Sequence, residues 1–240
     1  MNTPERGDAP GVILPWDSEF FGFRIGRVKA SRLTPDTLRS VLAWAAAEKL
    51  RCAYFSADAE CAETLALAHE GGFQFVDLRV DLATPVRAAD ALPAHAGFRP
   101  ATTADLPALE AISRVAHRDT RFFKDAQFPA ARAADLYAEW IQRDFRVHHV
   151  FTVPGNTGYV TCQVDPATGT GRIGLIAVAE SERGRGLGRS LVGGALRWLG
   201  ESGCREVRVA TQASNVTAQR LYQAHGFRTA EGSATFHRWF

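Results

Sequence analysis

Residues 172–190 constrain the fold of this chain more than any other stretch. They read RIGLIAVAESERGRGLGRS, with an apolar run at 173–179, a short polar turn, three glycines at alternate positions and a helical pattern from Arg189. This order predicts a strand, a glycine-rich turn and the start of a helix. Backbone N–H groups there lack partners and carry partial positive charge, and glycines let a phosphate approach them. Because Arg183 and Arg185 add charge with Arg189, the stretch predicts a pyrophosphate site.

The spacing of the glycines does not fit two common phosphate-binding motifs. Gly184, Gly186 and Gly188 are two residues apart, unlike Gly-x-Gly-x-x-Gly, and no Gly-Lys-Ser/Thr follows them. The pattern Arg183-x-x-Gly186-x-Gly188 instead resembles the coenzyme A loop of the GCN5-related N-acetyltransferase (GNAT) family. The alternative is a plain strand-to-helix connection that uses glycine for close packing.

Composition sets limits on the class of protein. The chain has 240 residues, 46% of them hydrophobic and 22% charged, which is typical of one large or two small globular domains. A net charge of +2 gives no support for a nucleic-acid partner. The four cysteines form no Cys-x-x-Cys pair, so no metal site is expected. The N-terminus does not resemble a signal peptide and no apolar run reaches membrane-span length, so we expect a cytoplasmic protein without a membrane partner.

The order of predicted elements indicates two units. Residues 98–240 predict strand, helix, helix, three strands, helix, strand, helix and strand, which is the order of an acetyltransferase domain. Residues 85–97, rich in alanine and proline, predict a linker after a first unit at 1–84. Loops are predicted at 14–23, which holds four aromatic side chains, and at 118–127. A helix is predicted to start with Thr34 as its N-cap and Pro35 in its first turn. The predicted fold class is α/β with a mixed sheet, a GNAT domain preceded by a truncated, degenerate GNAT-like unit.

An internal repeat supports this division. Residues of the same type recur 154 positions apart (198 − 44 = 154), within helices and strands of the same order. The first unit lacks the phosphate loop, because Arg32 and Thr34 stand where Gly186 and Gly188 would be. We therefore expect the first unit to be structural or to shape the substrate site, and to bind no coenzyme. The alternative to the repeat is a chance alignment. The repeated pairs are Leu42 and Leu196, Trp44 and Trp198, Leu67 and Leu221, Gly72 and Gly226, and Phe73 and Phe227.

The family resemblance implies a site for acetyl-CoA, the co-substrate of these enzymes. It places the pantetheine arm along the strand before the loop, the pyrophosphate on the loop amides, and further contacts on the helix after the next strand. The implied strand residues are Ile176, Ala177 and Val178, and the implied loop residues are Arg183, Gly184, Arg185, Gly186, Leu187, Gly188, Arg189 and Ser190. On the later helix, Asn215, Ala218 and Tyr222 share one face because they are spaced by three, four and seven.

Acyl transfer to an amine needs a neutral amine and a proton for the leaving thiolate. Tyr222 stands where many family members place a tyrosine beside the coenzyme sulfur, and a phenol is protonated at neutral pH. A core tyrosine packed under Phe227 is the alternative. For the base, Asp77 and Asp81 are in phase with Phe73 and Phe75 on a strand of the first unit, and His117 is another candidate. The alternative for the two carboxylates is pairing with Arg79 or an exposed sheet edge. A base is not strictly required, since the amine can lose its proton to water.

Further stretches resemble one subgroup of the family, which acetylates the amine of nucleotide-linked amino-deoxysugars for cell-surface polysaccharide. They include WDSEFFG at 16–22, FQFVDLRVDLATP at 73–85 and VRVATQ at 207–212. The resemblance places a carboxylate at Asp77 and leads us to expect substrate contacts at Arg121, Phe122 and Tyr137. For these aromatic residues and for Trp140, the helix core is the alternative. Other small-molecule or protein amines, and a non-catalytic acyl-CoA-binding role, are alternatives. A homodimer is compatible with the resemblance, because this fold often pairs through sheet edges.

Overall fold

A computed structural model describes residues 9–86 and 97–240 of the chain. The fold is mixed α/β, as predicted, and divides into two compact units. The first unit comprises residues up to Arg79 together with Gly232–Phe240, and the second comprises Val80–Glu231. Both unit boundaries fall inside long strands, β4 (Gln74–Pro85) and β10 (Arg228–Trp239).

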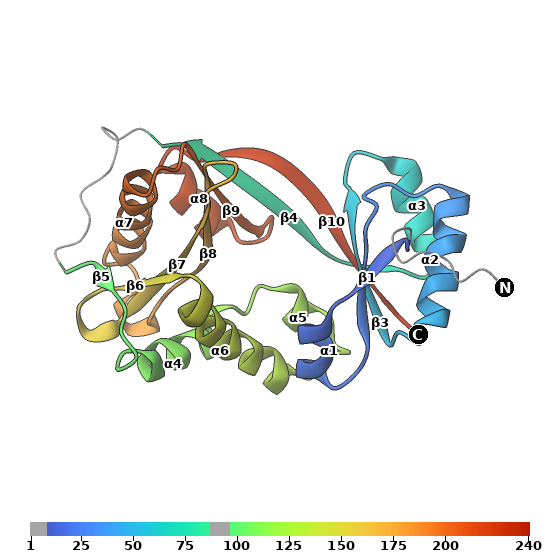
Figure 1. Ribbon diagram of the computed structural model, residues 1–240, viewed down its shortest axis with the longest axis horizontal. Helices are drawn as coiled ribbons and strands as arrows, with labels where there is room; N and C mark the ends of the chain where they lie inside the picture. Colours follow the sequence, from blue (N-terminus) through green and yellow to red (C-terminus); the bar gives the residue numbers. More distant parts are fainter. Residues whose placement is uncertain (1–8, 87–96) are drawn as a thin grey trace. The chain divides into compact units, whose positions relative to one another are not determined.

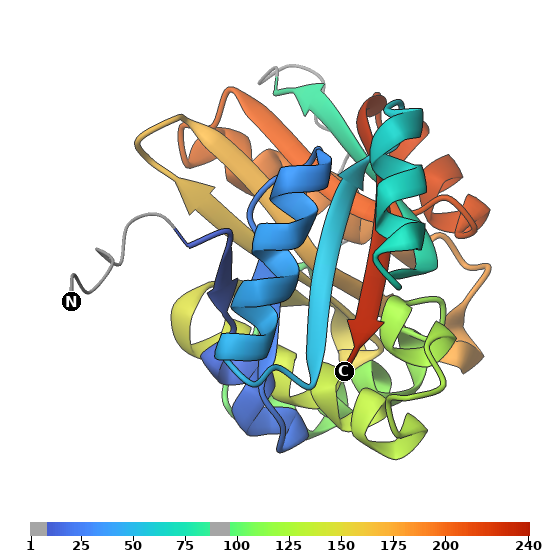
Figure 2. The same ribbon diagram turned by 90° about the vertical axis from the view of Figure 1, so that its right-hand side faces the viewer.

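In the first unit, α2 (Pro35–Ala47) and α3 (Ala62–Glu70) cover one face of a small sheet (Figure 2). The strand order is β1-β2-β3-β10, with β2 and β3 parallel and the other two pairs antiparallel. Apolar side chains of α2, α3 and β3 meet in a single core around Phe55 and Phe73. The elements before β4 are β1 (Gly11–Ile13), α1 (Pro15–Phe21), β2 (Ile25–Val28), α2 (Pro35–Ala47), β3 (Cys52–Asp58) and α3 (Ala62–Glu70).

The helix starts in this unit follow local sequence rules, and one helix, α1, forms where a loop was predicted. Thr34 caps α2 as predicted, because its hydroxyl oxygen accepts a hydrogen bond from the Thr37 N–H at 3.2 Å. The loop predicted at 14–23 is wrong over most of its length, since α1 forms there. Pro15 suits a first helical turn, and Trp16 and Phe20, four residues apart, stack with ring centroids 5.5 Å apart.

In the second unit, helices lie on both faces of the sheet, with α4 and α6 on one side and α7 and α8 on the other (Figure 1). The strand order is β4-β9-β8-β7-β6-β5, and β8 and β9 are parallel. The loop predicted at 118–127 contains a short helix, α5. The elements are β5 (Arg99–Pro100), α4 (Leu106–Ala116), α5 (Arg121–Lys124), α6 (Ala130–Val147), β6 (His149–Thr152), β7 (Gly158–Asp165), β8 (Thr170–Val178), α7 (Leu187–Glu201), β9 (Glu206–Gln212) and α8 (Val216–Gln223).

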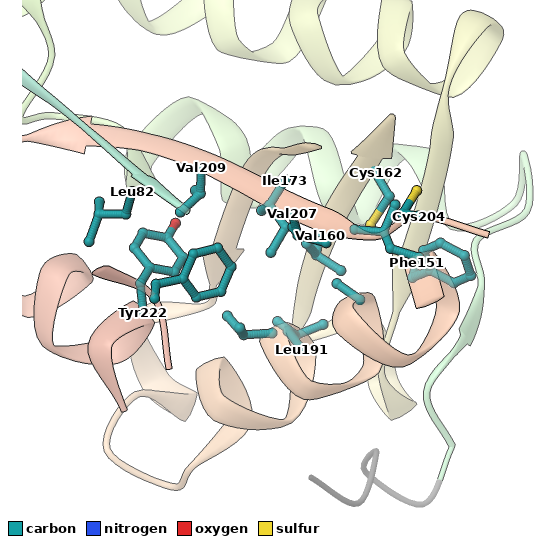
Figure 3. Packing of buried hydrophobic residues seen from close by; sticks show 14 of the residues in the cluster. Leu82, Phe151, Val160, Cys162, Ile173, Leu191, Cys204, Val207, Val209 and Tyr222 are labelled. Carbon is teal, nitrogen blue, oxygen red and sulfur yellow. The ribbon is translucent and has the colours of Figure 1, made fainter. Parts of the chain in front are cut away.

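Successive side chains of β7 enter different cores. Val160 packs with Leu191 of α7 in the larger core, which Figure 3 shows. Tyr159 packs with Leu109 and Ile141, from α4 and α6, on the opposite face. The central strands are thus buried on both sides, as expected where helices cover both faces of a sheet.

Several element boundaries recur at the 154-residue offset of the predicted repeat. β3 and β9 have seven residues each and begin 154 positions apart (206 − 52 = 154), and β4 and β10 match at the same offset (228 − 74 = 154). Gly72 and Gly226 both have a positive φ, at 77° and 81°, and the phenylalanine after each is buried. The end of β10 pairs with β3, so the last strand of the second repeat completes the sheet of the first unit.

The predicted domain ranges 1–84 and 98–240 differ from the compact units in two places, because Val80–Thr84 belongs to the second unit and Gly232–Phe240 to the first. Most of the predicted linker, residues 87–96, lies outside the described part of the chain. Among the helices that the structure describes, none is both long and apolar enough to cross a membrane.

Candidate active site

The parallel pair β8 and β9 separates partway along its length. Pairing runs from Thr170 with Glu206 to Ile173 with Val209. Beyond that point β8 continues to Val178 and β9 to Gln212 without pairing to each other. The backbone groups on the β9 side of residues 174–178 are therefore available to an extended ligand. The predicted pantetheine residues Ile176, Ala177 and Val178 lie in this segment.

A bulge accompanies the separation. The register between β7 and β8 shifts between Val160 and Cys162, which bends the strands locally. Gly174 stands opposite this bulge, where a Cβ would lie 2.6 Å from the Thr161 hydroxyl oxygen. Any larger residue would displace that hydroxyl, so the glycine is required by close approach. The buried carboxylate of Asp144, on α6, lies behind the same point.

The predicted phosphate loop joins β8 to α7 and is exposed. Gly184 and Gly186 have φ of 79° and 82°, a conformation that favours glycine, and no other part of the described chain lies near their Cβ positions. Gly186 is the N-cap of α7 and makes no side-chain cap, so the first N–H groups of the helix have no intrahelical partner. The loop thus presents donors to solvent in the way the sequence predicts.

The loop arginines differ in their partners. Arg183 donates from Nε to the carbonyl of Val178 at 3.3 Å, which places its guanidinium where β8 ends. Arg185 pairs with Glu182 at 3.0 Å, and both are solvent-exposed enough that the pair adds little stability. Arg189 is exposed in the first turn of α7. All three contribute positive charge beside the unpaired amides.

The helix that follows β9, α8, begins just beyond the part of β9 that no longer pairs with β8. Asn215 is the N-cap of α8, and its side-chain oxygen accepts a hydrogen bond from the Ala218 N–H at 3.0 Å. This cap accounts for the asparagine structurally and fixes the start of the helix that carries Tyr222. Contact of Asn215 and Ala218 with the coenzyme stays a prediction.

Tyr222 is 3% exposed and lies between α8 and the sheet. Its ring contacts that of Phe227, with centroids 5.7 Å apart, and its phenol oxygen points toward Val209 (Figure 3). Val209 is the last residue of β9 that pairs with β8, so the oxygen points to where the strands part. Burial raises the pKa of the Tyr222 phenol, which therefore remains protonated at neutral pH.

Asp77 is buried in β4, within the first compact unit. Phe75, two residues earlier on the same strand, is 58% exposed, so the shared apolar face that the sequence predicts is interrupted there. A buried carboxylate is costly unless it is compensated, which agrees with a specific role for Asp77. That this role is catalytic stays a prediction.

The predicted substrate residues come together in the second unit. The guanidinium of Arg121 lies 4.7 Å from the ring centre of Phe122. Trp140 contacts the rings of both Phe122 and Tyr137, at 6.4 and 5.2 Å. Lys124 of the same short helix donates to the hydroxyl of Ser214, one residue before the α8 cap. This hydrogen bond places α5 beside the end of β9, next to the separated strands.

A cavity in the second unit lies apart from this site. It has a volume of about 590 Å³, is lined by residues such as Phe98, His149 and Trp198, and includes none of the predicted site residues. In the described residues, no group of three or more metal-ligating side chains could hold a metal. Asp144 and Thr161 were not identified from the sequence, because each is a single polar residue without a motif and their partners are distant in the chain.

Two sequence comparisons find proteins that this chain is similar to. A sequence model of the acetyltransferase (GNAT) family matches residues 112–227. The chain is 31% identical, over 224 residues, to the dTDP-fucosamine acetyltransferase of Escherichia coli O6:H1 (strain CFT073), covering 89% of this chain and 91% of that protein.

Solved structures show the same fold. A GCN5-related N-acetyltransferase from Sphaerobacter thermophilus superposes with a TM-score of 0.63 at 16% identity, over 95% of this chain and 76% of that one. A tandem GNAT protein from the clavulanic acid biosynthesis pathway superposes with a TM-score of 0.60 at 15% identity, over 90% of this chain and 75% of that one.

Proposed function

Because this chain belongs to the acetyltransferase (GNAT) family and is an N-acetyltransferase, we propose that it acetylates the amine of a nucleotide-linked amino-deoxysugar. The observation that carries the substrate class is the near full-length match to a dTDP-fucosamine acetyltransferase, which includes the first unit as well as the family domain. The other curated relatives that match include mycothiol and N-alpha-acetyltransferases, and those matches span less than a third of this chain.

Enzymes of this family use acetyl-CoA, and the residues around the separated strands fit it. The unpaired edge of β8 suits the amides of a pantetheine arm, and the exposed amides of the loop suit a pyrophosphate. The guanidinium of Arg183, held at the end of β8, adds charge between these two regions. We assign Ile176, Ala177 and Val178 to the arm, and residues 183–190 to the pyrophosphate.

In the reaction, the acceptor amine attacks the thioester carbonyl carbon, the C–S bond breaks and the nitrogen gives up a proton. Tyr222 donates its phenolic proton to the departing thiolate, and water restores that proton afterwards. The phenol oxygen points to the place where β8 and β9 separate, which suits this role. The raised pKa of the phenol keeps it protonated, so it can donate.

A nucleotide-linked substrate carries phosphates and a flat base. Arg121 supplies a cation for a phosphate, and the half-buried Trp140, which contacts the Phe122 ring under Arg121, offers a flat ring, whereas Phe122 and Tyr137 are buried and pack behind them. Substrates without a nucleotide, such as amino acids, polyamines or peptide amines, would not need this combination.

The test is thiol release from acetyl-CoA with a panel of amines. The panel contains nucleotide-linked 4-amino and 3-amino deoxysugars, the free amino sugars, a polyamine and a peptide amine. We expect turnover with one nucleotide-linked sugar and at least tenfold lower kcat/KM with its free form. Turnover of the polyamine or peptide at a higher kcat/KM would overturn the substrate assignment.

Two variants sharpen the test. Arg121→Ala is expected to raise KM for the nucleotide-linked sugar about tenfold while leaving the free sugar unchanged. The exposed Arg146 on α6 provides the matched control, and Arg146→Ala is expected to change neither value. Equal effects of the two variants would show that Arg121 does not bind the nucleotide.

A further inference from the structure

A chain of buried hydrogen bonds links the end of α4 to the sheet. His117 Nε2 and the Tyr159 phenol oxygen are 2.9 Å apart, the Tyr159 and Ser113 oxygens are 2.8 Å apart, and Ser113 Oγ is 2.7 Å from the Tyr137 carbonyl oxygen. Ser113 and Tyr159 are fully buried, whereas His117 is half-buried. The His117 ring also stacks on Tyr137, with centroids 4.7 Å apart.

The direction of this chain is fixed at its buried end. The carbonyl of Tyr137 can only accept, so the Ser113 hydroxyl donates to it. Ser113 then accepts from the Tyr159 phenol, which uses the only proton of that phenol. The phenol oxygen must therefore accept from His117 Nε2–H. Neutral His117 is held as the Nε2–H tautomer, and its Nδ1 carries a lone pair.

Nδ1 of His117 is left for a ligand. In the described chain, the hydrogen bonds of this residue run through Nε2 and through its backbone carbonyl, which accepts from the Thr120 hydroxyl. Burial lowers the pKa of His117 to about 4, so the imidazole is neutral at physiological pH. The titratable groups next to it are Tyr137 from α6, Tyr159 from β7 and Arg118 in the chain, and the charge of Asp144 acts on Tyr159.

These hydrogen-bonded residues, His117, Tyr159 and Ser113, are called the relay below. The relay lies beside the segment of β8 that we assign to the pantetheine arm. Tyr159 is paired across the β7–β8 ladder with Ala177, in the β8 segment that has no β9 partner. Tyr159 and Ala177 pack with α4 and α6, whereas Tyr222 packs in the core beside α7. The two sets of groups thus approach the separated strands from opposite faces of the sheet. An amine can attack from one face while the thiolate is protonated from the other.

We propose that His117 Nδ1 accepts the proton of the acceptor amine, and that Tyr159 and Ser113 are positioning residues that fix its tautomer. This proposal rests on the N-acetyltransferase activity and names the base for it. As the amine nitrogen bonds to the carbonyl carbon, its proton passes to Nδ1, the C–S bond breaks, and Tyr222 protonates the thiolate. The imidazolium then returns its proton to water. A weakly basic imidazole suffices, because a nitrogen already bonding to carbon is far more acidic than a free ammonium group.

The experiment compares kcat/KM across pH for the wild type, His117→Gln, His117→Ala and Tyr159→Phe, with whichever amine the wild type acetylates. Gln keeps a donor for Tyr159 but cannot take a proton, so we expect kcat/KM to fall at least 100-fold with the dissociation constant of coenzyme A within twofold of wild type. Added imidazole is expected to restore part of the His117→Ala activity. In Tyr159→Phe, kcat/KM is expected to fall about tenfold, because the variant keeps the base but no longer holds His117 in the Nε2–H tautomer.

A second readout needs no substrate. In ¹⁵N spectra of ring-labelled protein, we expect the proton of His117 on Nε2 in the wild type and a mixture of tautomers in Tyr159→Phe. A proton on Nδ1 in the wild type would overturn the proposal, whatever the activity. So would a His117→Gln variant with wild-type kcat/KM, or a large loss in Asp77→Asn with none in His117→Gln, which would identify Asp77 as the base. Failure of nucleotide sugars as substrates would count only against the substrate assignment.

Discussion

Thr161 of β7 accepts a hydrogen bond from the backbone N–H of Leu175 on β8, at 2.9 Å. The bond occurs at the bulge, where a side chain substitutes for a ladder partner. Since the hydroxyl oxygen accepts from Leu175, its proton is free to go to the carboxylate of Asp144, with which Thr161 is hydrogen-bonded. Asp144 and Thr161 therefore hold β8 in its bent course, just beyond its last pairing with β9.

Replacing Thr161 with Val should disturb both the stability and the site. The change keeps the shape of the side chain but leaves the Leu175 N–H and the buried Asp144 without this partner, which costs about 1–3 kcal/mol of unfolding free energy. We expect weaker coenzyme binding and faster hydrogen exchange at the Leu175 amide. Thr152 is a matched control, because it is equally buried and donates to the Gly158 carbonyl at 2.8 Å in the same unit. Thr152→Val should lower stability without changing coenzyme affinity.

The phosphate loop can be tested by two glycines with the same backbone geometry. Gly186, with φ of 82°, and Gly203, with φ of 85°, precede and follow α7, and both have open space at the Cβ position. Alanine at either costs about 1–2 kcal/mol of stability through the left-handed conformation alone. We expect Gly186→Ala to weaken coenzyme A binding about tenfold by calorimetry and Gly203→Ala to leave it unchanged. Equal affinities in the two variants would refute the loop assignment.

Removing the phenol hydroxyl of Tyr222 should slow the reaction and spare coenzyme binding. General acid catalysis typically contributes 10²–10⁴-fold, so Tyr222→Phe should lower kcat by about that factor. Because burial raises its pKa, the wild-type kcat should show no alkaline decline from this group below pH of about 10. Unchanged kcat in Tyr222→Phe would show that the residue is only part of the core beside Phe227.

The depressed pKa of His117 predicts a contribution to acid sensitivity. An unfolded histidine takes up a proton near pH 6.5, whereas folded His117 does so near its pKa of about 4. Between these values the unfolded chain binds more protons, so stability falls as pH drops from 6.5 toward 4. His117→Gln should lose less Tm than wild type between pH 7 and pH 5. His69→Gln, at an exposed site on α3, is the control and should behave like wild type.

Some predictions from the sequence are confirmed because they rest on local rules. The glycine-rich turn between β8 and α7 could be placed from Gly184 and Gly186, since few other residues adopt a positive φ without strain. The helix start at Thr34 and Pro35 followed from the preferences of caps and first turns. The helix at Pro15–Phe21 was missed, because its aromatic residues suggested a loop held by the core.

By itself, the sequence determined most of the order of strands and helices, the glycine-rich turn before α7 and the place of Tyr222 on the helix after β9, because each depends on residues close together in the chain. Only the tertiary structure decided where β8 leaves β9, and that His117, Tyr159 and Ser113 form one relay. Tyr159 and Ser113 are 46 residues apart, and no local pattern marks either as polar groups that must find each other. Their pairing follows from burial, because a phenol and a hydroxyl removed from water in a packed core must bond to one another.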